Sequence, residues 1–221
     1  MRRGYVNPWQ EMQMKTKFPS RKYPSAGAYT LEYAVNLATA LQSVGGDQID
    51  RAAALLSRAI REDRLIFACG NGGSAAISNH LTCDCSKGIA TGTGLRPRVF
   101  SLSATVELVT AIANDLEFSE VFVQQLRTAA RPGDVLMTIS SSGDSENIVR
   151  AVKWARENGM ATIALTGFSG GRSAGLADVS LHVAADNYGV VEDTHQSLMH
   201  ILAQYLRLEA LPADQMAATR F

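Results

Sequence analysis

Short apolar runs alternate with helical patterns in the chain beyond residue 64. The apolar runs have the length and character of buried strands, and they cover residues 65–69, 98–102, 135–139, 161–165 and 179–183. Apolar positions at helical spacing lie between or after them, at 75–86, 105–113, 119–129, 146–158 and 191–209. Strands that alternate with helices predict an α/β fold with a five-stranded parallel sheet that helices cover on both faces.

The segment before the first strand has helical patterns of its own. Residues 29–41 and 49–61 are predicted helices, and a Gly-Gly pair interrupts the periodicity between them. Residues 1–26 hold three prolines among basic and polar residues, and we interpret them as a flexible N-terminal extension. The predicted domain therefore spans residues 27–221 and includes both helices.

Composition narrows the classes of function. The 221 residues carry 21 Lys and Arg against 21 Asp and Glu, a formal net charge of +0, whereas general nucleic-acid binders carry a basic excess. No apolar stretch approaches the roughly 18 residues of a membrane span, and none follows Arg2 and Arg3 to make a signal peptide. We therefore expect a cytoplasmic protein without nucleic-acid or membrane partners. Cys69, Cys83 and Cys85 are expected to be reduced thiols that pack in or beside the core.

A serine-rich loop follows the predicted strand at 135–139. It reads Ser140-Ser141-Ser142-Gly143-Asp144-Ser145, and a helical pattern starts directly after it. Hydroxyls and the free N–H groups of a first helical turn can hold an anion together, and the helix dipole favours negative charge there. An ordinary helix cap needs only one such hydroxyl. With no lysine nearby, the loop favours a sugar phosphate over a nucleoside triphosphate with its magnesium.

A second loop, Gly70-Asn71-Gly72-Gly73-Ser74, follows the first predicted strand. It matches neither the dinucleotide glycine pattern nor a phosphate loop that ends in Lys-Ser/Thr, so a plain tight turn is a sufficient explanation for it alone. Ligands of open α/β sheets bind beyond the carboxyl ends of the strands, where this loop and the serine-rich loop both lie. The pair suggests one ligand held between two strand ends.

Polar residues in three helical patterns are further candidates. His80 and Asp84 are four apart and share a helix face, so they can share a metal ion or form an acid–base pair, or simply hydrogen-bond at the surface. His200 interrupts an apolar stretch, where a core or interface histidine is the alternative. Asn114 and Asp115 end a largely apolar helical pattern, either as a helix end and turn or as partners of sugar hydroxyls.

Several of these segments, in this order and separation, resemble the sugar isomerase (SIS) domain family, in particular the phosphoheptose isomerases. The resemblance runs from about residue 31 to residue 208. It rests on the motifs at residues 69–74, 113–115, 132–136, 139–145, 164–171 and 192–200. It implies a three-layer, flavodoxin-like α/β/α sandwich preceded by N-terminal helices, and a homotetramer with active sites at subunit interfaces.

The resemblance also assigns roles to residues. Substrate contacts fall on Asn71, Gly72, Gly73, Ser74, Asn114 and Asp115, and phosphate contacts on Ser140, Ser141, Ser142 and Ser145. The family's metal-binding and catalytic positions fall on His80, Asp84, Glu192 and His200, with one zinc ion (Zn²⁺) per subunit. Among these, we expect Asp84 and His200 to form the acid–base pair, with Glu192 as a substitute.

Two positions depart from the family pattern. Asp84 stands where the heptose isomerases usually have Glu, which shortens the side chain by about 1.3 Å. Glu192 stands where they usually have Gln, which adds a carboxylate and can compensate for the first change. Glu192 and His200 are eight residues apart, about 12 Å of rise on an unbroken helix. For both residues to serve one metal site across this rise, either Glu192 lies ahead of the helix and folds back, or one ion takes ligands from two subunits.

These observations lead to one main hypothesis and two alternatives. The main one is an aldose–ketose isomerase that converts sedoheptulose 7-phosphate to D-glycero-D-manno-heptose 7-phosphate through an enediol, a step in heptose biosynthesis. One alternative is a non-catalytic SIS protein, either a phosphosugar sensor or a tetramer that binds a replication initiator. The other is an isomerase of a different phosphosugar, because a phosphate anchor is indifferent to the rest of the sugar.

Overall fold

The structure is a computed structural model that describes residues 17–221. Its strands are β1 (Leu65–Gly70), β2 (Arg98–Ser101), β3 (Val135–Ser140), β4 (Ala161–Thr166) and β5 (Val179–His182). Its main helices are α1 (Ala26–Gln42), α2 (Gly46–Arg61), α3 (Gly73–Cys83), α4 (Val106–Asp115), α5 (Val123–Ala129), α6 (Glu146–Glu157), α7 (Gly171–Leu176) and α8 (Tyr188–Ala210). Three short helices are η1 (Asp84–Ile89), η2 (Phe118–Glu120) and η3 (Ala213–Ala218). Each predicted strand is present and ends within one residue of its predicted bounds.

The five strands form one parallel sheet in the order β2-β1-β3-β4-β5. This is the flavodoxin-like order, in which the direction of winding reverses between the first and third strands. The carboxyl ends of β1 and β3 lie beside each other at this point, with Gly70 paired to Ile139. The sheet therefore brings together the two loops that the sequence marked as ligand-binding candidates.

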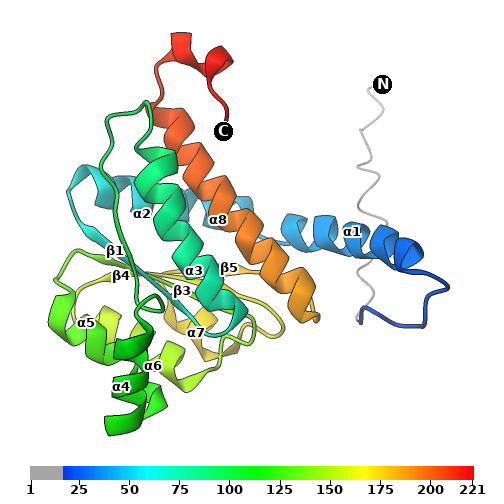
Figure 1. Ribbon diagram of the computed structural model, residues 1–221, viewed down its shortest axis with the longest axis horizontal. Helices are drawn as coiled ribbons and strands as arrows, with labels where there is room; N and C mark the ends of the chain where they lie inside the picture. Colours follow the sequence, from blue (N-terminus) through cyan, green and yellow to red (C-terminus); the bar gives the residue numbers. More distant parts are fainter. Residues whose placement is uncertain (1–16) are drawn as a thin grey trace, which may run out of the picture.

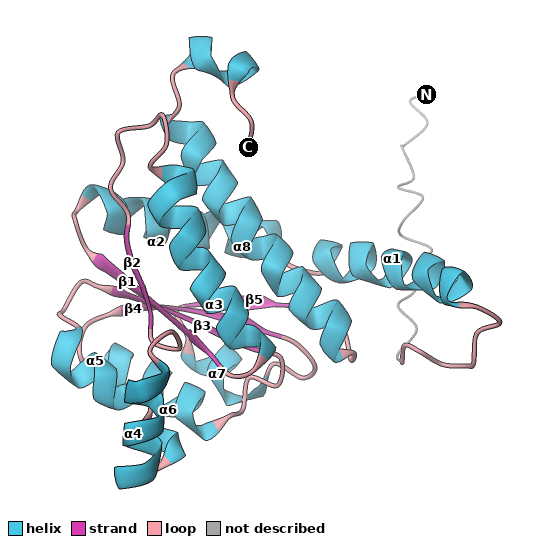
Figure 2. Cartoon of the chain, viewed as in Figure 1, coloured by secondary structure: helices cyan, strands magenta, loops and turns pink. Residues whose placement is uncertain are grey.

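Helices cover both faces of the sheet, so the predicted three-layer α/β/α sandwich is confirmed (Figure 2). On one face, side chains such as Met137 pack with α2, α3 and α8. On the other face, Phe67 and Leu136 pack with α4, α5 and α6. Alternate residues of β1 and β3 enter opposite cores, which explains why these strands read as continuous apolar runs.

Two helices begin at side chains that cap their free N–H groups. The Ser25 hydroxyl accepts a hydrogen bond from Ala28 N (3.1 Å) at the start of α1. The Asn187 side chain accepts one from Val190 N (3.0 Å), so α8 begins at Tyr188 rather than at residue 191. This earlier start places Glu192 more than one turn inside the helix.

The predicted helix over residues 75–86 differs from the observed one. The chain forms α3 up to Cys83 and continues as a π-helix, η1, from Asp84. A π-helix hydrogen-bonds from residue i to i+5, and it occurs frequently at functional sites. Apolar periodicity contains no signal for this change of hydrogen-bonding partner.

Helix α1 extends away from the sandwich and meets the start of α8 (Figure 1). Tyr33 of α1 donates a hydrogen bond to Asp193 Oδ2 (2.6 Å), and burial together with this bond raises the pKa of the tyrosine. Phe18, inside the predicted extension, is buried against Tyr23 and Tyr29. The remainder of the extension, residues 1–16, lies outside the described residues, and the domain boundary at residue 26 stays a prediction.

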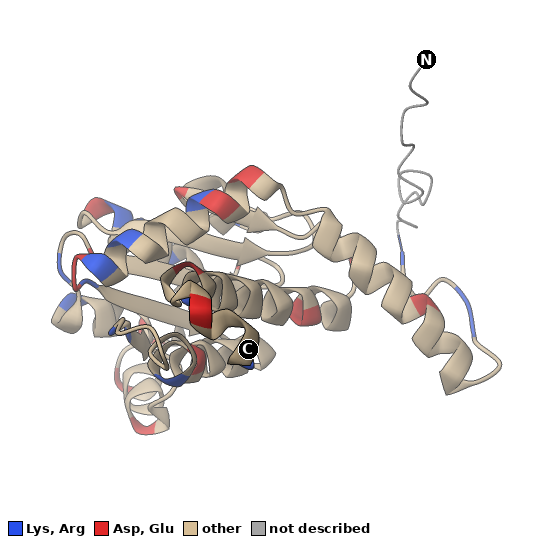
Figure 3. Cartoon of the chain, turned by 90° about the horizontal axis from the view of Figure 1, so that it is seen from above, with Lys and Arg blue, Asp and Glu red and all other residues tan. Residues whose placement is uncertain are grey.

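Basic and acidic positions are intermixed over the same elements of the molecule, as Figure 3 shows for the described residues. None of the helices formed by residues 17–221 combines the length and apolar character needed to cross a membrane.

Candidate active site

The loop after β1 is held to helix α6 by a reciprocal pair of amides. Asn71 Nδ2 donates to Asn147 Oδ1 (3.0 Å), and Asn147 Nδ2 donates back to Asn71 Oδ1 (2.9 Å). Asn147 is almost fully buried, so this pair fixes the position of the Asn71 side chain. Sequence reasoning missed Asn147, because an Asn in the first turn of a helix is common and its partner lies 76 residues away.

Glycines let other groups approach the same loop closely. Gly72 has φ +53° and ψ −123°, a conformation that side chains disfavour. At Gly73, a Cβ atom would lie only 2.6 Å from Glu192 Oε2. The Glu192 carboxylate therefore lies over the first turn of α3, where the helix dipole favours negative charge.

The serine-rich loop connects β3 to α6. Ser140 Oγ accepts a hydrogen bond from Gly143 N (3.2 Å), and Ser142 Oγ accepts one from Asp144 N (3.3 Å). Ser145 is the N-cap residue of α6, but its hydroxyl makes no capping hydrogen bond. At Gly143, with φ +63°, a Cβ would overlap the carbonyl oxygen of Gly170, so only glycine fits there.

Two hydroxyls near this loop are buried without a hydrogen-bond partner. They belong to Ser141, in the loop itself, and to Ser173 of α7, which lies against Gly143. A buried hydroxyl without a partner costs about 1–3 kcal/mol. The Ser141 hydroxyl, at the carboxyl end of β3, thus has hydrogen-bonding capacity that the described residues do not use.

The acidic residue of the loop is neutralised by an arginine. Arg172 Nε donates to Asp144 Oδ1 (2.5 Å), and Arg172 Nη1 donates to Glu146 Oε2 (2.9 Å). The bond from Arg172 holds the pKa of the Asp144 carboxyl below its ordinary value. The loop can therefore accept an anion with Asp144 already paired.

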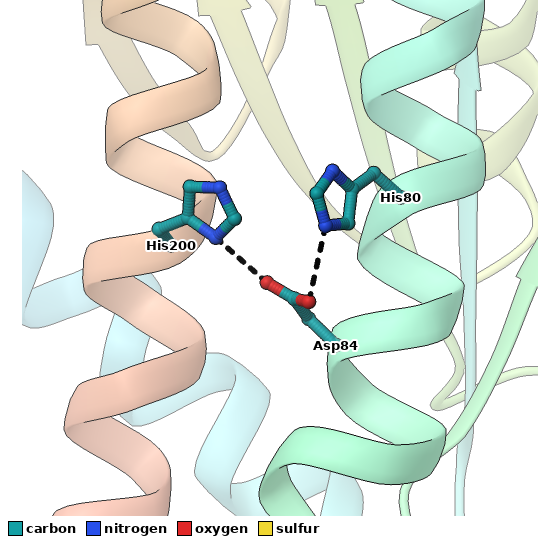
Figure 4. Close-up of side chains that lie close together, drawn as sticks. All are labelled: His80, Asp84 and His200. Carbon is teal, nitrogen blue, oxygen red and sulfur yellow. Dashed lines mark hydrogen bonds and ion pairs between the residues drawn. The ribbon is translucent and has the colours of Figure 1, made fainter. Parts of the chain in front are cut away.

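His80, Asp84 and His200 form a compact cluster between α3, η1 and α8 (Figure 4). Asp84 Oδ2 lies 2.8 Å from His200 Nδ1, and Asp84 Oδ1 lies 3.3 Å from His80 Nε2. The two imidazole rings meet edge to face, with centroids 5.0 Å apart. Asp84 is the first residue of the π-helix, so its carboxylate faces both histidines at the point where the helical hydrogen bonding changes.

This cluster has the composition of a metal site. Each residue offers one ligand atom, and the three atoms lie within 4.8 Å of one another. Two imidazoles and one carboxylate are the set found in catalytic zinc sites that leave a position open for substrate. The group can hold a metal ion.

Gln196 also belongs to this cluster. Its Nε2 atom lies 2.9 Å from His200 Nε2 and 3.3 Å from His80 Nδ1. Sequence reasoning missed Gln196, although its spacing of four residues from both Glu192 and His200 places all three on one helix face.

Glu192 lies apart from the metal-competent group. It is inside α8, an unbroken helix from Tyr188 to Ala210, so the alternative in which Glu192 precedes the helix and folds back is wrong. Its carboxylate faces Gly73 instead. Its roles in metal binding and catalysis stay predictions.

Asn114 and Asp115 occupy the exposed C-terminal end of α4. Asn114 Nδ2 donates to Asp115 Oδ1 (2.8 Å). Within residues 17–221, no hydrogen bond or ion pair joins either side chain to the two loops or to the histidine cluster. Their predicted contact with substrate stays a prediction.

One further histidine of α8 and two of the cysteines differ in their burial. His195 is fully buried on α8, and burial lowers its pKa to about 4, against a weaker opposing interaction with the Thr166 backbone. Burial raises the pKa of the Cys85 thiol to about 12. The expectation that Cys83 packs in or beside the core is wrong, because the residue is exposed at the end of α3.

Comparison with known proteins fits this geometry. The SIS domain model matches residues 30–167. The phosphoheptose isomerase of Coxiella burnetii is 33% identical over 192 residues, which cover 85% of this chain and 95% of the relative. That of Akkermansia muciniphila is 36% identical over 77% of this chain and 89% of its own. The chain belongs to the phosphoheptose isomerases of the SIS domain family.

Solved structures of this family share the fold. Phosphoheptose isomerase GmhA from Neisseria gonorrhoeae superposes with a TM-score of 0.72 at 35% identity, covering 81% of this chain and 95% of that one. A phosphoheptose isomerase from Francisella tularensis gives a TM-score of 0.69 at 31% identity, covering 81% and 92%. The resemblance identified from the motifs is confirmed.

Proposed function

We propose that this chain is an aldose–ketose isomerase that converts sedoheptulose 7-phosphate to D-glycero-D-manno-heptose 7-phosphate. The observation that carries the proposal is the acid–base cluster of His80, Asp84 and His200, which accompanies an anion-binding loop at the carboxyl end of β3. Membership of the phosphoheptose isomerases supplies the class of substrate.

The serine-rich loop would anchor the phosphate. Ser141 and Ser145 have hydroxyls that are not used within the loop, and Ser140 and Ser142 can still donate theirs. The first turn of α6 adds backbone N–H groups and a favourable dipole. Such an anchor holds the substrate by one end.

The other end of the sugar would lie along the Asn71 loop. Asn71, Gly72, Gly73 and Ser74 border the space between the two strand ends, and Asn147 holds the Asn71 amide in place. Asn114 and Asp115 would join them from a neighbouring subunit.

Proton transfer between C1 and C2 through an enediol needs one group that removes a proton and one that returns it. Asp84 and His200 are hydrogen-bonded to each other, so a proton gained by one can be shared with the other. Glu192, over the Asn71 loop, is the substitute for the base. Asp84 lies in η1, and Glu192 and His200 both lie on α8.

His80, Asp84 and His200 would hold one zinc ion per subunit. The chemistry that such an ion supplies is Lewis-acid polarisation of a carbonyl oxygen. Glu192 would join as a further ligand only if the site rearranges or a second subunit contributes.

The assembly would be a homotetramer with active sites at subunit interfaces. Helix α1 stands away from the sandwich and exposes Leu31 (74%) and Val35 (42%). An apolar face on a projecting helix is typical of a surface between subunits. The free cysteines suit the reducing cytoplasm, where we place the enzyme.

A coupled assay across C5 to C8 ketose phosphates, with and without added zinc, tests the function. We expect turnover of sedoheptulose 7-phosphate above the other sugars and loss of turnover on chelation. Higher turnover of another sugar would identify a different phosphosugar isomerase. No turnover of any sugar, with phosphate binding intact and no bound zinc, would indicate a non-catalytic phosphosugar-binding protein.

A further inference from the structure

The side-chain amide of Gln196 connects the two histidines of the cluster on the side opposite Asp84. Its Nε2 atom is within hydrogen-bonding distance of His200 Nε2 (2.9 Å) and His80 Nδ1 (3.3 Å). Asp84 approaches the other nitrogen of each ring, at 2.8 Å from His200 Nδ1 and 3.3 Å from His80 Nε2. The three hydrogen bonds, together with the ion pair between His80 Nε2 and Asp84 Oδ1, close a ring of four side chains.

The chemistry of these groups allows one assignment of hydrogens in neutral rings. An amide NH₂ has two hydrogens and no lone pair to accept with, so both contacts of Gln196 require acceptor nitrogens. A neutral imidazole then has its hydrogen on the other nitrogen. Those hydrogens point at Asp84, whose ionised carboxylate only accepts. Each donor in the ring meets an acceptor.

The opposite orientation of the amide gives a poor match. If Gln196 turned Oε1 toward the histidines, the ring nitrogens facing it would have to donate. In neutral rings, the nitrogens facing Asp84 would then present lone pairs to a carboxylate. A cation held between them would relieve that repulsion.

We propose that Gln196 is a positioning residue that sets the tautomers of His80 and His200. Without metal, its NH₂ group holds the hydrogens on His80 Nε2 and His200 Nδ1. When a cation is held by these two nitrogens and Asp84, the hydrogens lie on the opposite nitrogens, and Gln196 accepts them with Oε1 after its amide turns over. This second half rests on the proposed zinc site.

Substitutions at residue 196 test the metal-free and the metal-bound parts of the proposal separately. Leu keeps helix propensity and offers no hydrogen bond, so it supports neither state. Glu accepts but does not donate, so it favours only the metal-loaded tautomers. Loss of the hydrogen-bond partner of a metal-ligating histidine typically weakens metal affinity by 10- to 100-fold.

The first experiment measures histidine tautomers in the zinc-free protein by long-range ¹H–¹⁵N NMR of the imidazoles. We expect the wild type to have the hydrogen on Nε2 of His80 and on Nδ1 of His200, and Gln196→Leu to give mixed tautomers at both. Assignment comes from His80→Gln and His200→Gln spectra. Opposite tautomers in the wild type, or the same tautomers in Gln196→Leu, would overturn the proposal whether or not zinc binds.

The second experiment measures zinc affinity by competition with a chelator. We expect Gln196→Leu to bind zinc 10- to 100-fold more weakly than the wild type, and Gln196→Glu to bind it at least as tightly as the wild type. Ser197→Glu is the control for added charge, because it lies one position along the helix and its hydroxyl contacts Asp193 O instead. It should bind zinc with the affinity of the wild type.

Equal or tighter zinc binding by Gln196→Leu would mean that the amide does not support the ion, and it would overturn the second half. If the wild type binds no zinc at all, the proposed metal fails, while the tautomer measurement still decides the role of Gln196. Circular dichroism and thermal unfolding of each variant confirm that the fold is retained.

Discussion

The substitution Ser141→Ala tests whether the Ser141 hydroxyl binds the ligand or stabilises the fold. Ser141 is buried, and its hydroxyl has no partner within the described residues. A hydrogen bond to a charged group contributes about 1.5–3 kcal/mol. Its loss corresponds to about a 10- to 150-fold weaker binding of the phosphate, since each 1.4 kcal/mol is about tenfold.

The same substitution should leave the free energy of unfolding unchanged or raise it. Removal of a buried hydroxyl that has no partner removes its desolvation cost, about 1–3 kcal/mol. Binding of sedoheptulose 7-phosphate and of inorganic phosphate is measured by titration calorimetry, and unfolding by urea. KM should rise more than kcat falls, because the phosphate is held equally in the ground state and the transition state.

Thr138→Val is the matched control. Thr138 lies in β3, ahead of the loop, and its hydroxyl is also buried without a partner within the described residues. This variant should keep phosphate affinity and stability. If Ser141→Ala lowers stability and leaves phosphate affinity unchanged, the hydroxyl is structural, and the anchoring role of Ser141 is refuted.

Three further predictions concern other residues of the site and the core. His200→Gln should lower kcat by at least about 10²-fold while the melting temperature stays near that of the wild type, because it removes a general acid–base group; retained turnover would exclude His200 from proton transfer. Gly73→Ala should lower kcat/KM at least about tenfold, because its Cβ would lie 2.6 Å from Glu192 Oε2 and must displace that carboxylate; an unchanged kcat/KM would show that the position of Glu192 does not matter. For His195, the folded pKa of about 4 lies below the unfolded value of about 6.5, so the unfolded chain takes up the proton first. Stability should therefore fall by about 3 kcal/mol as pH drops from about 6.5 to 4. Urea unfolding across this range should show that loss in the wild type and a smaller one in His195→Gln, and parallel losses would contradict the assignment.

Local sequence patterns predicted most of the secondary structure because burial imposes them. The strand at 135–139 reads as continuous apolar residues, and the observed β3 is buried at every position. The start of α8 was placed three residues late, because the Asn187 cap precedes the apolar periodicity. The π-helix at Asp84 had no signal, since its hydrogen bonds depend on packing between α3 and α8.

The candidate site was predictable in part. The serine-rich loop and the Asn71 loop stand out locally, because both follow apolar runs and carry more polar or glycine residues than a turn requires. Gln196 was within reach of the same reasoning through its helical spacing. His195 and Asn147 were not, because whether a polar side chain on a helix meets solvent or core depends on elements distant in the chain.

The sequence by itself determined the class of fold, the two loops and the identity of the groups that can carry charge or protons. Periodicity and turn chemistry are local, so they are visible without coordinates. Only the tertiary structure decided that β1 and β3 are neighbours, that Asp84 meets His200 across 116 residues, and that Glu192 faces Gly73 instead of the histidines. These contacts depend on strand order and helix packing. Both are set by the free energy of the whole chain, so no single segment of the sequence predicts them.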